Sequence, residues 1–135
     1  MSNLRSLTYV SRVSDSMSEA EFTFLGLEAG RLNALDGITG LLVFNGERFC
    51  QTIEGAPEAI ENLVERLKRD PRHEDFAVLD DGDVPTRRFR SWDMQLLAVP
   101  GDKQAALDLA RLRFEAEADF SARAKIYQTV EGAFA

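Results

Sequence analysis

The chain has 135 residues, of which 44% are hydrophobic and 29% are charged. These values suit one globular domain with its own core, and they exclude disordered, collagenous and low-complexity chains. No apolar run approaches the roughly 18 residues of a membrane span, so we expect no membrane partner. The formal charge of −7 disfavours nucleic acid as a partner. The single cysteine and the lack of a signal sequence favour a cytoplasmic protein.

The N-terminal part of the chain predicts a strand followed by a helix. Residues 4–11 are rich in Leu, Thr, Tyr and Val, which is typical of a strand. Ser18 and Glu21 have the spacing of a capping box, and the helix that they begin should end before Gly37. Its apolar positions follow helical spacing: Phe22, Leu25, Ala29 and Leu32.

Asn45-Gly46 is a strong hairpin signal between two apolar segments, residues 38–44 and 48–54. A two-residue turn at this point would place Gly40 opposite Gln51. Gln51 would then lie on a strand face whose other members are Gly40, Leu42, Phe49 and Ile53.

The middle of the chain predicts a second helix and two further strands. Pro57 should open the helix and Asp70-Pro71 should end it, with the apolar stripe Ile60, Leu63, Val64 and Leu67. Residues 76–79 predict a short strand that ends at the acidic residues 80–83. Residues 92–99 predict the last strand.

Residues 102–130 predict helices, with a break near residues 115–121 and an apolar stripe of Ala105, Leu109, Leu112 and Ala116. The element order indicates an α+β fold, a ferredoxin-like βαββαββ sandwich with two helices on one sheet face. We expect the C-terminal helices to pack on the sheet as well.

Two amide side chains interrupt otherwise apolar faces. Gln51 lies among apolar neighbours, and a buried amide without partners costs roughly 1–3 kcal/mol. Either a polar group meets it, or it reaches water from an edge strand. Asn33 ends the apolar face of the first helix, where it would act as a C-terminal cap or present a donor and an acceptor to a flat heterocycle.

A basic cluster lies near the end of the second helix, at Arg66, Lys68, Arg69 and Arg72. Such a cluster could hold a phosphate-bearing small molecule. The simpler interpretation is a solvated helix end with cations placed favourably for the helix dipole.

Patterns typical of enzymes are sparse. His73 is the only histidine, so a histidine-based metal cluster is excluded, and its expected position is not beside Cys50. Arg12 and Asn33 could be placed in the roles of an acylphosphatase-like hydrolase, but the phosphate-cradling loop is absent. We therefore expect no enzyme.

Five separated motifs follow one another along the chain. They are LTYVS at residues 7–11, NALDGITGLL at 33–42, FCQTIEG at 49–55, DPRH at 70–73 and RFRSWDM at 88–94. Together they resemble the motifs of the BLUF domain family, the blue-light sensors using flavin. The resemblance covers roughly residues 3–98.

The resemblance implies that a flavin lies between the two helices with its ring over the sheet. The cofactor would be FAD, with FMN or riboflavin as alternatives. Tyr9 would hydrogen-bond to Gln51, and Gln51 and Asn33 would contact the polar edge of the ring. The other expected cofactor contacts are Leu25, Arg66, Asp70, Arg72 and His73, and the switch would also involve Trp92 and Met94.

The resemblance also implies a blue-light photoreceptor. An electron and then a proton would move transiently from Tyr9, and Gln51 would change its orientation or tautomer. The signal would leave through the last strand, which we expect next to the Gln51 strand. Residues 1–100 would form the flavin-binding domain. Residues 101–135 would form a helical extension in the same compact unit, on the sheet face away from the flavin.

The expected partner is a downstream protein or a second copy of the chain. Three alternatives remain open: a light-insensitive flavin-binding module, the acylphosphatase-like hydrolase and a plain oligomerisation domain. The visible spectrum before and after illumination would distinguish them.

Overall fold

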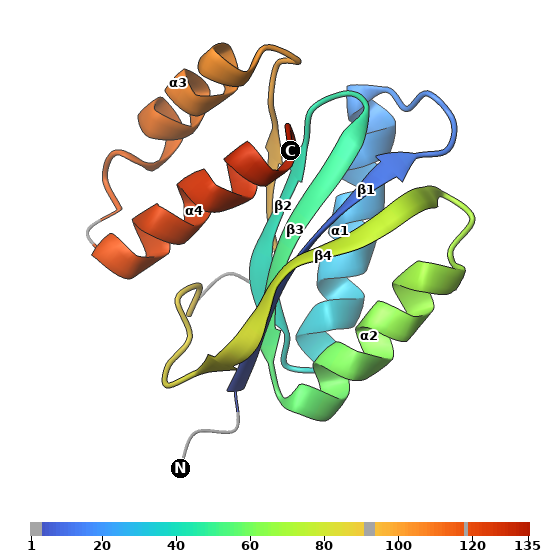
Figure 1. Cartoon of the computed structure of the whole chain (residues 1–135), viewed down its shortest axis with the longest axis vertical. Helices are drawn as coiled ribbons and strands as arrows, with labels where there is room; N and C mark the ends of the chain where they lie inside the picture. The colour runs from blue at the N-terminus through green and yellow to red at the C-terminus, as the bar shows by residue number, and fades with distance from the viewer. Residues whose placement is uncertain (1–3, 91–93, 118) are drawn as a thin grey trace.

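The computed structural model describes residues 4–90, 94–117 and 119–135 (Figure 1). In this part of the chain five strands form one sheet, and four helices pack around it. The strands are β1 (Leu4–Val13), β2 (Thr39–Phe44), β3 (Arg48–Gly55), β4 (His73–Val84) and β5 (Gln95–Ala98). The helices are α1 (Glu19–Leu35), α2 (Pro57–Arg69), α3 (Lys103–Phe114) and α4 (Phe120–Gly132).

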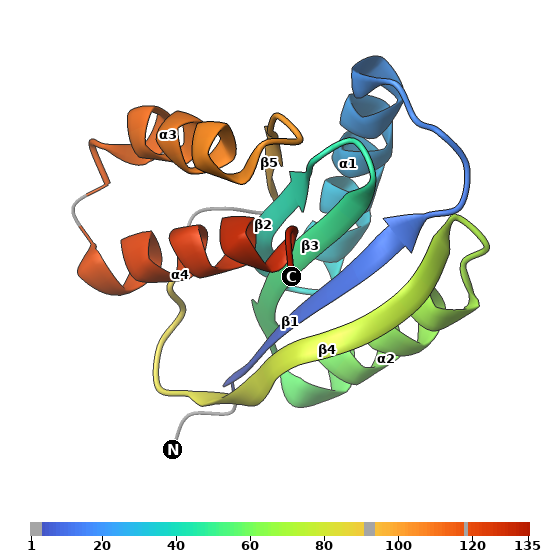
Figure 2. The same ribbon diagram turned by 45° about the horizontal axis from the view of Figure 1, so that its top comes forward.

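The sheet has the order β4-β1-β3-β2-β5, in which only the β2–β5 pair is parallel. Helices α1 and α2 cover one face, which we call the front face, and α4 covers the other, the back face (Figure 2). Helix α3 stacks against α4. The α+β ferredoxin-like fold and the C-terminal helices packed on the sheet are confirmed.

The starts of the first two helices follow the sequence signals. Ser18 accepts a hydrogen bond from the backbone N–H of Glu21, and the Glu21 side chain accepts one from the backbone N–H of Ser18. Pro57 begins α2, whose buried residues are Ile60, Leu63 and Val64. In α1, Phe22 is buried as predicted, but Leu32 is 43% exposed.

The predicted hairpin register is wrong by two residues. Leu42 lies opposite Gln51, where a two-residue turn would place Gly40. Asn45 lengthens the turn, because its Oδ1 accepts backbone N–H groups two and three residues ahead, at 3.0 and 2.8 Å. Gly46 provides the positive φ of 95°. Because strand side chains alternate, a shift of two residues keeps each side chain on its predicted face.

Strand β4 is longer than the predicted segment of residues 76–79, and the acidic residues 80–83 lie within it. Pairing with the full length of β1 extends it, and two ion pairs hold its acidic part. Asp81 binds Arg5 of β1 at 2.8 Å, and Asp80 binds Lys125 of α4 at 2.8 Å.

The last strand also differs from prediction. It spans four residues, Gln95–Ala98, and it pairs with β2 rather than with β3, which carries Gln51. The expectation that the last strand would neighbour the Gln51 strand is therefore wrong. Trp92 lies outside the described residues.

The break between α3 and α4 is confirmed, but the predicted buried stripe of α3 is wrong. Its buried residues are Ala106, Ala110 and Phe114, whereas Leu112 is 69% exposed. Ala106 and Ala110 join a back-face core that includes Cys50 of β3 and Ile126 of α4. Which side of α3 is buried depends on where α4 lies, and the sequence of α3 alone does not contain that information.

We predict that Gly40→Ala lowers the free energy of unfolding by about 1–3 kcal/mol. A Cβ at residue 40 would overlap the backbone carbonyl oxygen of Thr52 on the paired strand, which cannot yield as a side chain can. Urea unfolding would measure the loss. Gly82→Ala in β4 is the matched control, because a Cβ there meets no atom within 4 Å among the described residues. Equal stability of the two variants would contradict the prediction.

Candidate functional site

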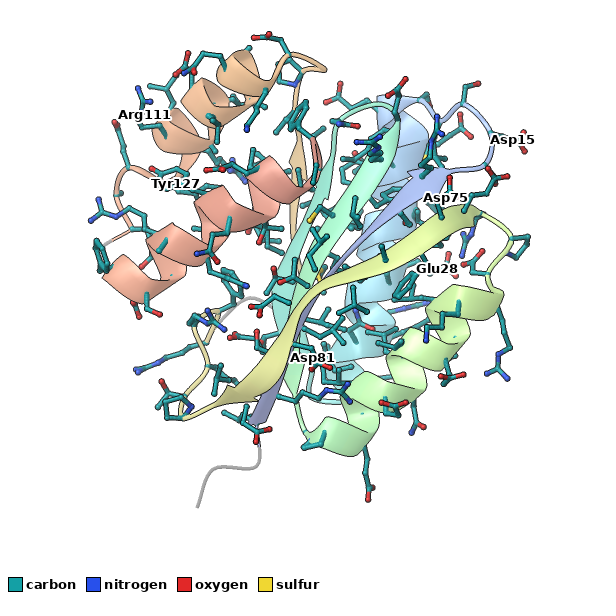
Figure 3. All side chains as sticks on the ribbon, viewed as in Figure 1. Asp15, Glu28, Asp75, Asp81, Arg111 and Tyr127 are labelled. Atoms are coloured by element: carbon teal, nitrogen blue, oxygen red, sulfur yellow. The ribbon has the colours of Figure 1, made fainter. Side chains whose placement is uncertain are left out.

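A cleft lies between α1, α2 and the front face of the sheet, with about 820 Å³ of empty space including its open mouth. Strands β1, β2 and β3 supply its floor, and the two helices supply its walls. Glu28, which extends from α1 beside α2, lies at its edge (Figure 3). The structure brings all eight predicted cofactor contacts to this cleft: Tyr9, Leu25, Asn33, Gln51, Arg66, Asp70, Arg72 and His73.

A chain of hydrogen bonds crosses the floor of the cleft. Tyr9 of β1 lies directly opposite Gln51 of β3, and its Oη donates to Gln51 Oε1 at 2.7 Å. Gln51 Nε2 then donates to the Sδ of Met94 at 3.3 Å. Burial raises the pKa of Tyr9 well above its usual value, so the phenol stays protonated. Gln51 is therefore held between a strong donor and a weak sulfur acceptor.

Met94, the residue before β5, reaches Gln51 of β3 although β2 lies between β3 and β5. Met94 packs against two groups of buried front-face residues, one that includes Tyr9 and Ile60 and one that includes Phe22 and Leu42. Helix α1 comes close at this point, since a Cβ on Gly30 would lie 3.2 Å from the Met94 Cβ. The Met94 contact thus joins the floor of the cleft to the edge of the sheet.

Asn33 is a buried amide that faces the cleft. It lies in the last turn of α1, and its backbone carbonyl accepts the N–H groups of Asp36 and Ile38 at 3.1 and 2.9 Å. Its side chain is 3% exposed and has no hydrogen-bond partner among the described residues. Its amide is therefore open to the cleft rather than sealed in the core, and a ligand there could supply a donor and an acceptor. The polar edge of a flavin ring fits this requirement.

The mouth of the cleft carries two of the four clustered cations. Arg72 binds Asp70 through its Nε and Nη2, with a shortest distance of 2.7 Å, and this hydrogen bonding lowers the pKa of Asp70. Arg66 lies 3.3 Å from Asp36 and is half exposed. The other two cations do not line the cleft, and Lys68 instead lies over the ring of Phe76 at 5.9 Å.

Sequence reasoning missed the apolar lining of the cleft. Phe49 and Leu42 on the sheet and Leu63, Leu67, Ala29 and Leu32 on the helices line it. Apolar residues around a cavity have the same spacing as core residues, so the sequence gives no signal that separates the two. Only the two amide residues among these apolar neighbours, Asn33 and Gln51, mark the position of the cleft.

His73 lies at the end of the cleft beside Ser11, whose Oγ is 2.7 Å from the His73 Nδ1. Its ring lies 5.1 Å from that of Phe49. Burial lowers the pKa of His73 below its ordinary value. As the pH falls, the unfolded chain therefore binds a proton before the folded chain does.

We predict that the free energy of unfolding decreases as the pH falls from about 7.5 to about 5.5, because the unfolded state binds more protons in this range. His73→Gln should reduce this slope. Three carboxyl groups also have a lowered pKa: Asp70, Asp80 and Asp81. Their contribution to the free energy of unfolding is lost only at more acidic pH. Urea unfolding of the flavin-loaded proteins at both pH values would measure the slopes. Equal slopes in the two proteins would contradict the prediction.

A family model described as "BLUF: Sensors of blue-light using FAD" matches residues 4–95. The photoactivated adenylate cyclase subunit beta of Euglena gracilis is 35% identical over 88 residues, which are 65% of this chain and 10% of that protein. The blue light- and temperature-regulated antirepressor BluF of Escherichia coli (strain K12) is 32% identical over 93 residues, 69% of this chain and 23% of that protein. The chain thus matches less than a quarter of the length of either relative.

Two solved structures are similar over nearly the whole chain. The BLUF protein BlrB in its dark state has a TM-score of 0.73 and 33% identity, with 96% of each chain covered. The BLUF domain of BlrP1 has a TM-score of 0.78 and 31% identity, with 99% of this chain and 90% of that chain covered. The family model, the relatives and the fold agree with the motifs, and this chain belongs to the BLUF family of blue-light sensors.

Proposed function

We propose that this BLUF domain signals blue light by reorganising the hydrogen bonds among Tyr9, Gln51 and Met94. The proposal rests on two consecutive hydrogen bonds: Tyr9 donates to Gln51 at 2.7 Å, and Gln51 donates to Met94 at 3.3 Å. The bound flavin supplies the absorption of blue light and an electron acceptor. The protein supplies the hydrogen bonds that respond, and we assign it no catalytic activity of its own.

The cofactor is proposed to be FAD, in keeping with the family description. Asn33 and Gln51 would bind the polar edge of the ring, and Leu25 would pack on its face. Arg66 and Arg72 at the mouth would attract the phosphates. Asp70 and His73 also line this end of the cleft. Asp70 orients Arg72 by accepting hydrogen bonds from its Nε and Nη2.

The Gln51 amide has two chemically different ends, which makes it a switch. At present Tyr9 donates to its oxygen and its nitrogen donates to a sulfur atom. If the amide reversed, its nitrogen would face Tyr9, and its oxygen would face a sulfur that cannot donate. The contact with Met94 would then be lost. A change of tautomer would instead turn the Gln51 oxygen from an acceptor into a donor and so alter its bond to Tyr9.

The back face offers a second route from Gln51. The next residue, Thr52, points to the back face, where its Oγ1 lies 2.8 Å from Thr8 Oγ1 and 2.7 Å from Thr129 Oγ1 of α4. Lys125 of α4 is 2% exposed and binds Asp80. Polar contacts therefore attach α4 to the sheet one residue from the switch. We propose residues 1–100 as the sensor and residues 101–135 as the output helices of one compact unit.

The output would be read by a partner protein or by a second copy of the chain, and we propose a cytoplasmic setting, which the unpaired Cys50 fits. No helix among the described residues is long and apolar enough to span a membrane. The described residues also contain no cluster of three metal-binding side chains.

A hydrolase function finds no support in the geometry. Arg12 lines a separate hollow with Asp75, whereas Asn33 faces the front-face cleft, so the two cannot share a phosphate. Cys50 lies in the back-face core, and burial raises its pKa to about 12. His73 is on the front face, so it cannot activate that thiol.

We predict that Gln51→Leu still binds flavin but loses the light-induced red shift. One hydrogen bond contributes about 0.5–1.5 kcal/mol, so flavin affinity should fall by no more than about tenfold. Absorption spectra before and after a blue flash would test this. Gln95→Leu is the control: it makes the same change in β5, at a residue level with Leu41 on the back face, and it should keep the red shift. A full red shift in Gln51→Leu would refute the proposed switch.

We predict that blue light lowers amide protection in residues 120–132, because the attachment of α4 begins one residue from Gln51. Hydrogen exchange in the dark and under illumination would measure the change. The Gln51→Leu protein serves as a control, since light should leave its exchange unchanged. If protection of α4 stays constant while the flavin spectrum shifts, the output does not pass through this helix.

A further inference from the structure

We propose that Glu54 is a positioning residue that sets the contact between Met94 and Gln51 from the opposite face of the sheet. This inference rests on the proposed function. Glu54 follows Gln51 by three residues in β3, so its side chain points to the back face while that of Gln51 points to the front. Its carboxylate nevertheless holds Arg88 and Phe89, which precede Met94 by six and five residues.

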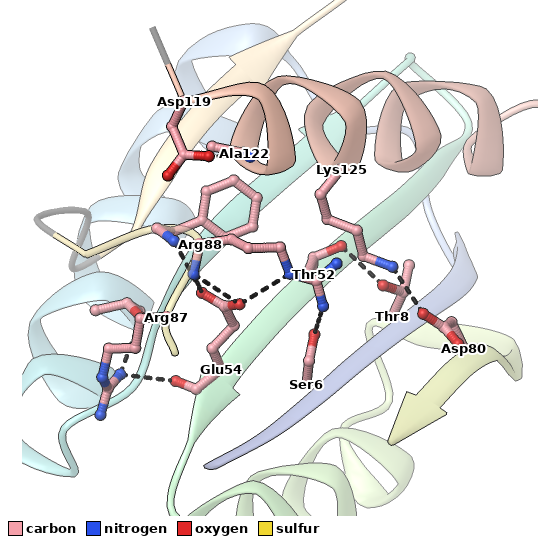
Figure 4. Close-up of polar contacts among 12 residues, drawn as sticks. Ser6, Thr8, Thr52, Glu54, Asp80, Arg87, Arg88, Asp119, Ala122 and Lys125 are labelled. Atoms are coloured by element: carbon pink, nitrogen blue, oxygen red, sulfur yellow. Dashed lines mark hydrogen bonds and ion pairs between the residues drawn. The ribbon is translucent and has the colours of Figure 1, made fainter. Parts of the chain in front are cut away.

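The Glu54 side chain is fully buried, and both of its oxygens accept hydrogen bonds from one short segment. Oε1 accepts the backbone N–H groups of Arg88 and Phe89 at 3.0 and 2.9 Å. Oε2 lies 3.1 Å from the Arg88 backbone nitrogen and 3.4 Å from its Nε (Figure 4). A buried carboxylate that satisfies two consecutive backbone N–H groups fixes the main chain as well as a side chain.

Further contacts hold the same segment, residues 87–89, to three strands. Arg87 Nη1 donates to Thr39 Oγ1 of β2 at 2.9 Å and to the backbone carbonyl of Glu54 at 3.1 Å. Arg88 Nη2 donates to Ser6 Oγ of β1 at 3.0 Å. Phe89 is 1% exposed and belongs to the back-face core. Glu54 lies at the centre of these contacts.

Met94 follows Phe89 by only five residues, and it lies on the front face against Gln51. On its C-terminal side β5 holds it through the β2 ladder. On its N-terminal side, the nearest described residues that are fixed to the sheet are residues 87–89, which Glu54 holds. The position of Met94 therefore depends on two fixed ends, and loss of the Glu54 carboxylate would free one of them.

The test observes the Met94 methyl group directly. Labelling with methyl-¹³C methionine gives three signals, from Met1, Met17 and Met94, and Met94→Leu identifies the third. Spectra are recorded on flavin-loaded protein in the dark. Recovery of the absorption spectrum after a blue flash is measured on the same samples.

Glu54→Leu removes both acceptors, so we expect the Met94 signal to shift or split and the rate of dark recovery to change severalfold. Glu54→Gln keeps one oxygen, which can accept both backbone N–H groups as Oε1 does, and it should hold the Met94 signal near its wild-type position. Lys125→Leu removes another buried charge on the back face without touching residues 87–89. It is the matched control and should leave the Met94 signal in place.

If Glu54→Leu does not fold, Glu54→Asp takes its place. It keeps the charge but withdraws the carboxylate by one methylene, and it should move the Met94 signal more than Glu54→Gln does. An unmoved Met94 signal in the folded Leu or Asp variant would overturn the positioning role, and so would an equal shift in Lys125→Leu. A wild-type protein without a light response would refute the proposed function. The Met94 signals of the variants in the dark would still decide whether Glu54 positions Met94.

Discussion

Strand β3 is buried on both faces, yet it carries polar side chains, and each of them needs a partner. Gln51 finds Tyr9 and Met94 on the front face, while Thr52 and Glu54 find α4 and residues 87–89 on the back face. Because a buried polar group without a partner is costly, these bonds constrain everything that packs on either side of the strand. The sensor site and the supports behind it are therefore two faces of one strand.

In the proposed switch, this arrangement would allow a small change at Gln51 to have consequences at a distance. Thr52 and Glu54 on the same strand already make hydrogen bonds, so a rearrangement has few unused donors or acceptors to absorb it. Met94 is the weakest partner in the network, since a thioether accepts a hydrogen bond poorly. The contact with Met94 is therefore the bond that a rearrangement of Gln51 would break most easily.

The sequence predicted those features that depend on local patterns. Helical spacing and the capping box located α1 and α2, and strand alternation placed Gln51 and Cys50 on opposite faces. The isolated amides of Asn33 and Gln51 indicated the cleft before its walls were known. The family motifs then indicated the kind of ligand that the cleft would hold.

The features that could not be predicted depend on partners far away in the sequence. The hairpin register follows from the side chain of Asn45, which also donates to the carbonyl of Ala133 at 2.9 Å. The length of β4 depends on Arg5 and Lys125, which neutralise its acidic residues. The buried side of α3 depends on where α4 lies, and no local period encodes that position.

The acidic end of β4 has a consequence for solubility. β4 forms one edge of the sheet, and an exposed edge offers unpaired N–H and C=O groups to the strands of other molecules. Asp80 and Asp81 are paired with cations, but Asp83 places negative charge along this edge, and register shifts in the β1–β4 ladder make it irregular. A second molecule approaching edge to edge would bring like charges together. The residues that at first resemble a strand terminator thus disfavour edge-to-edge pairing of the longest described strand.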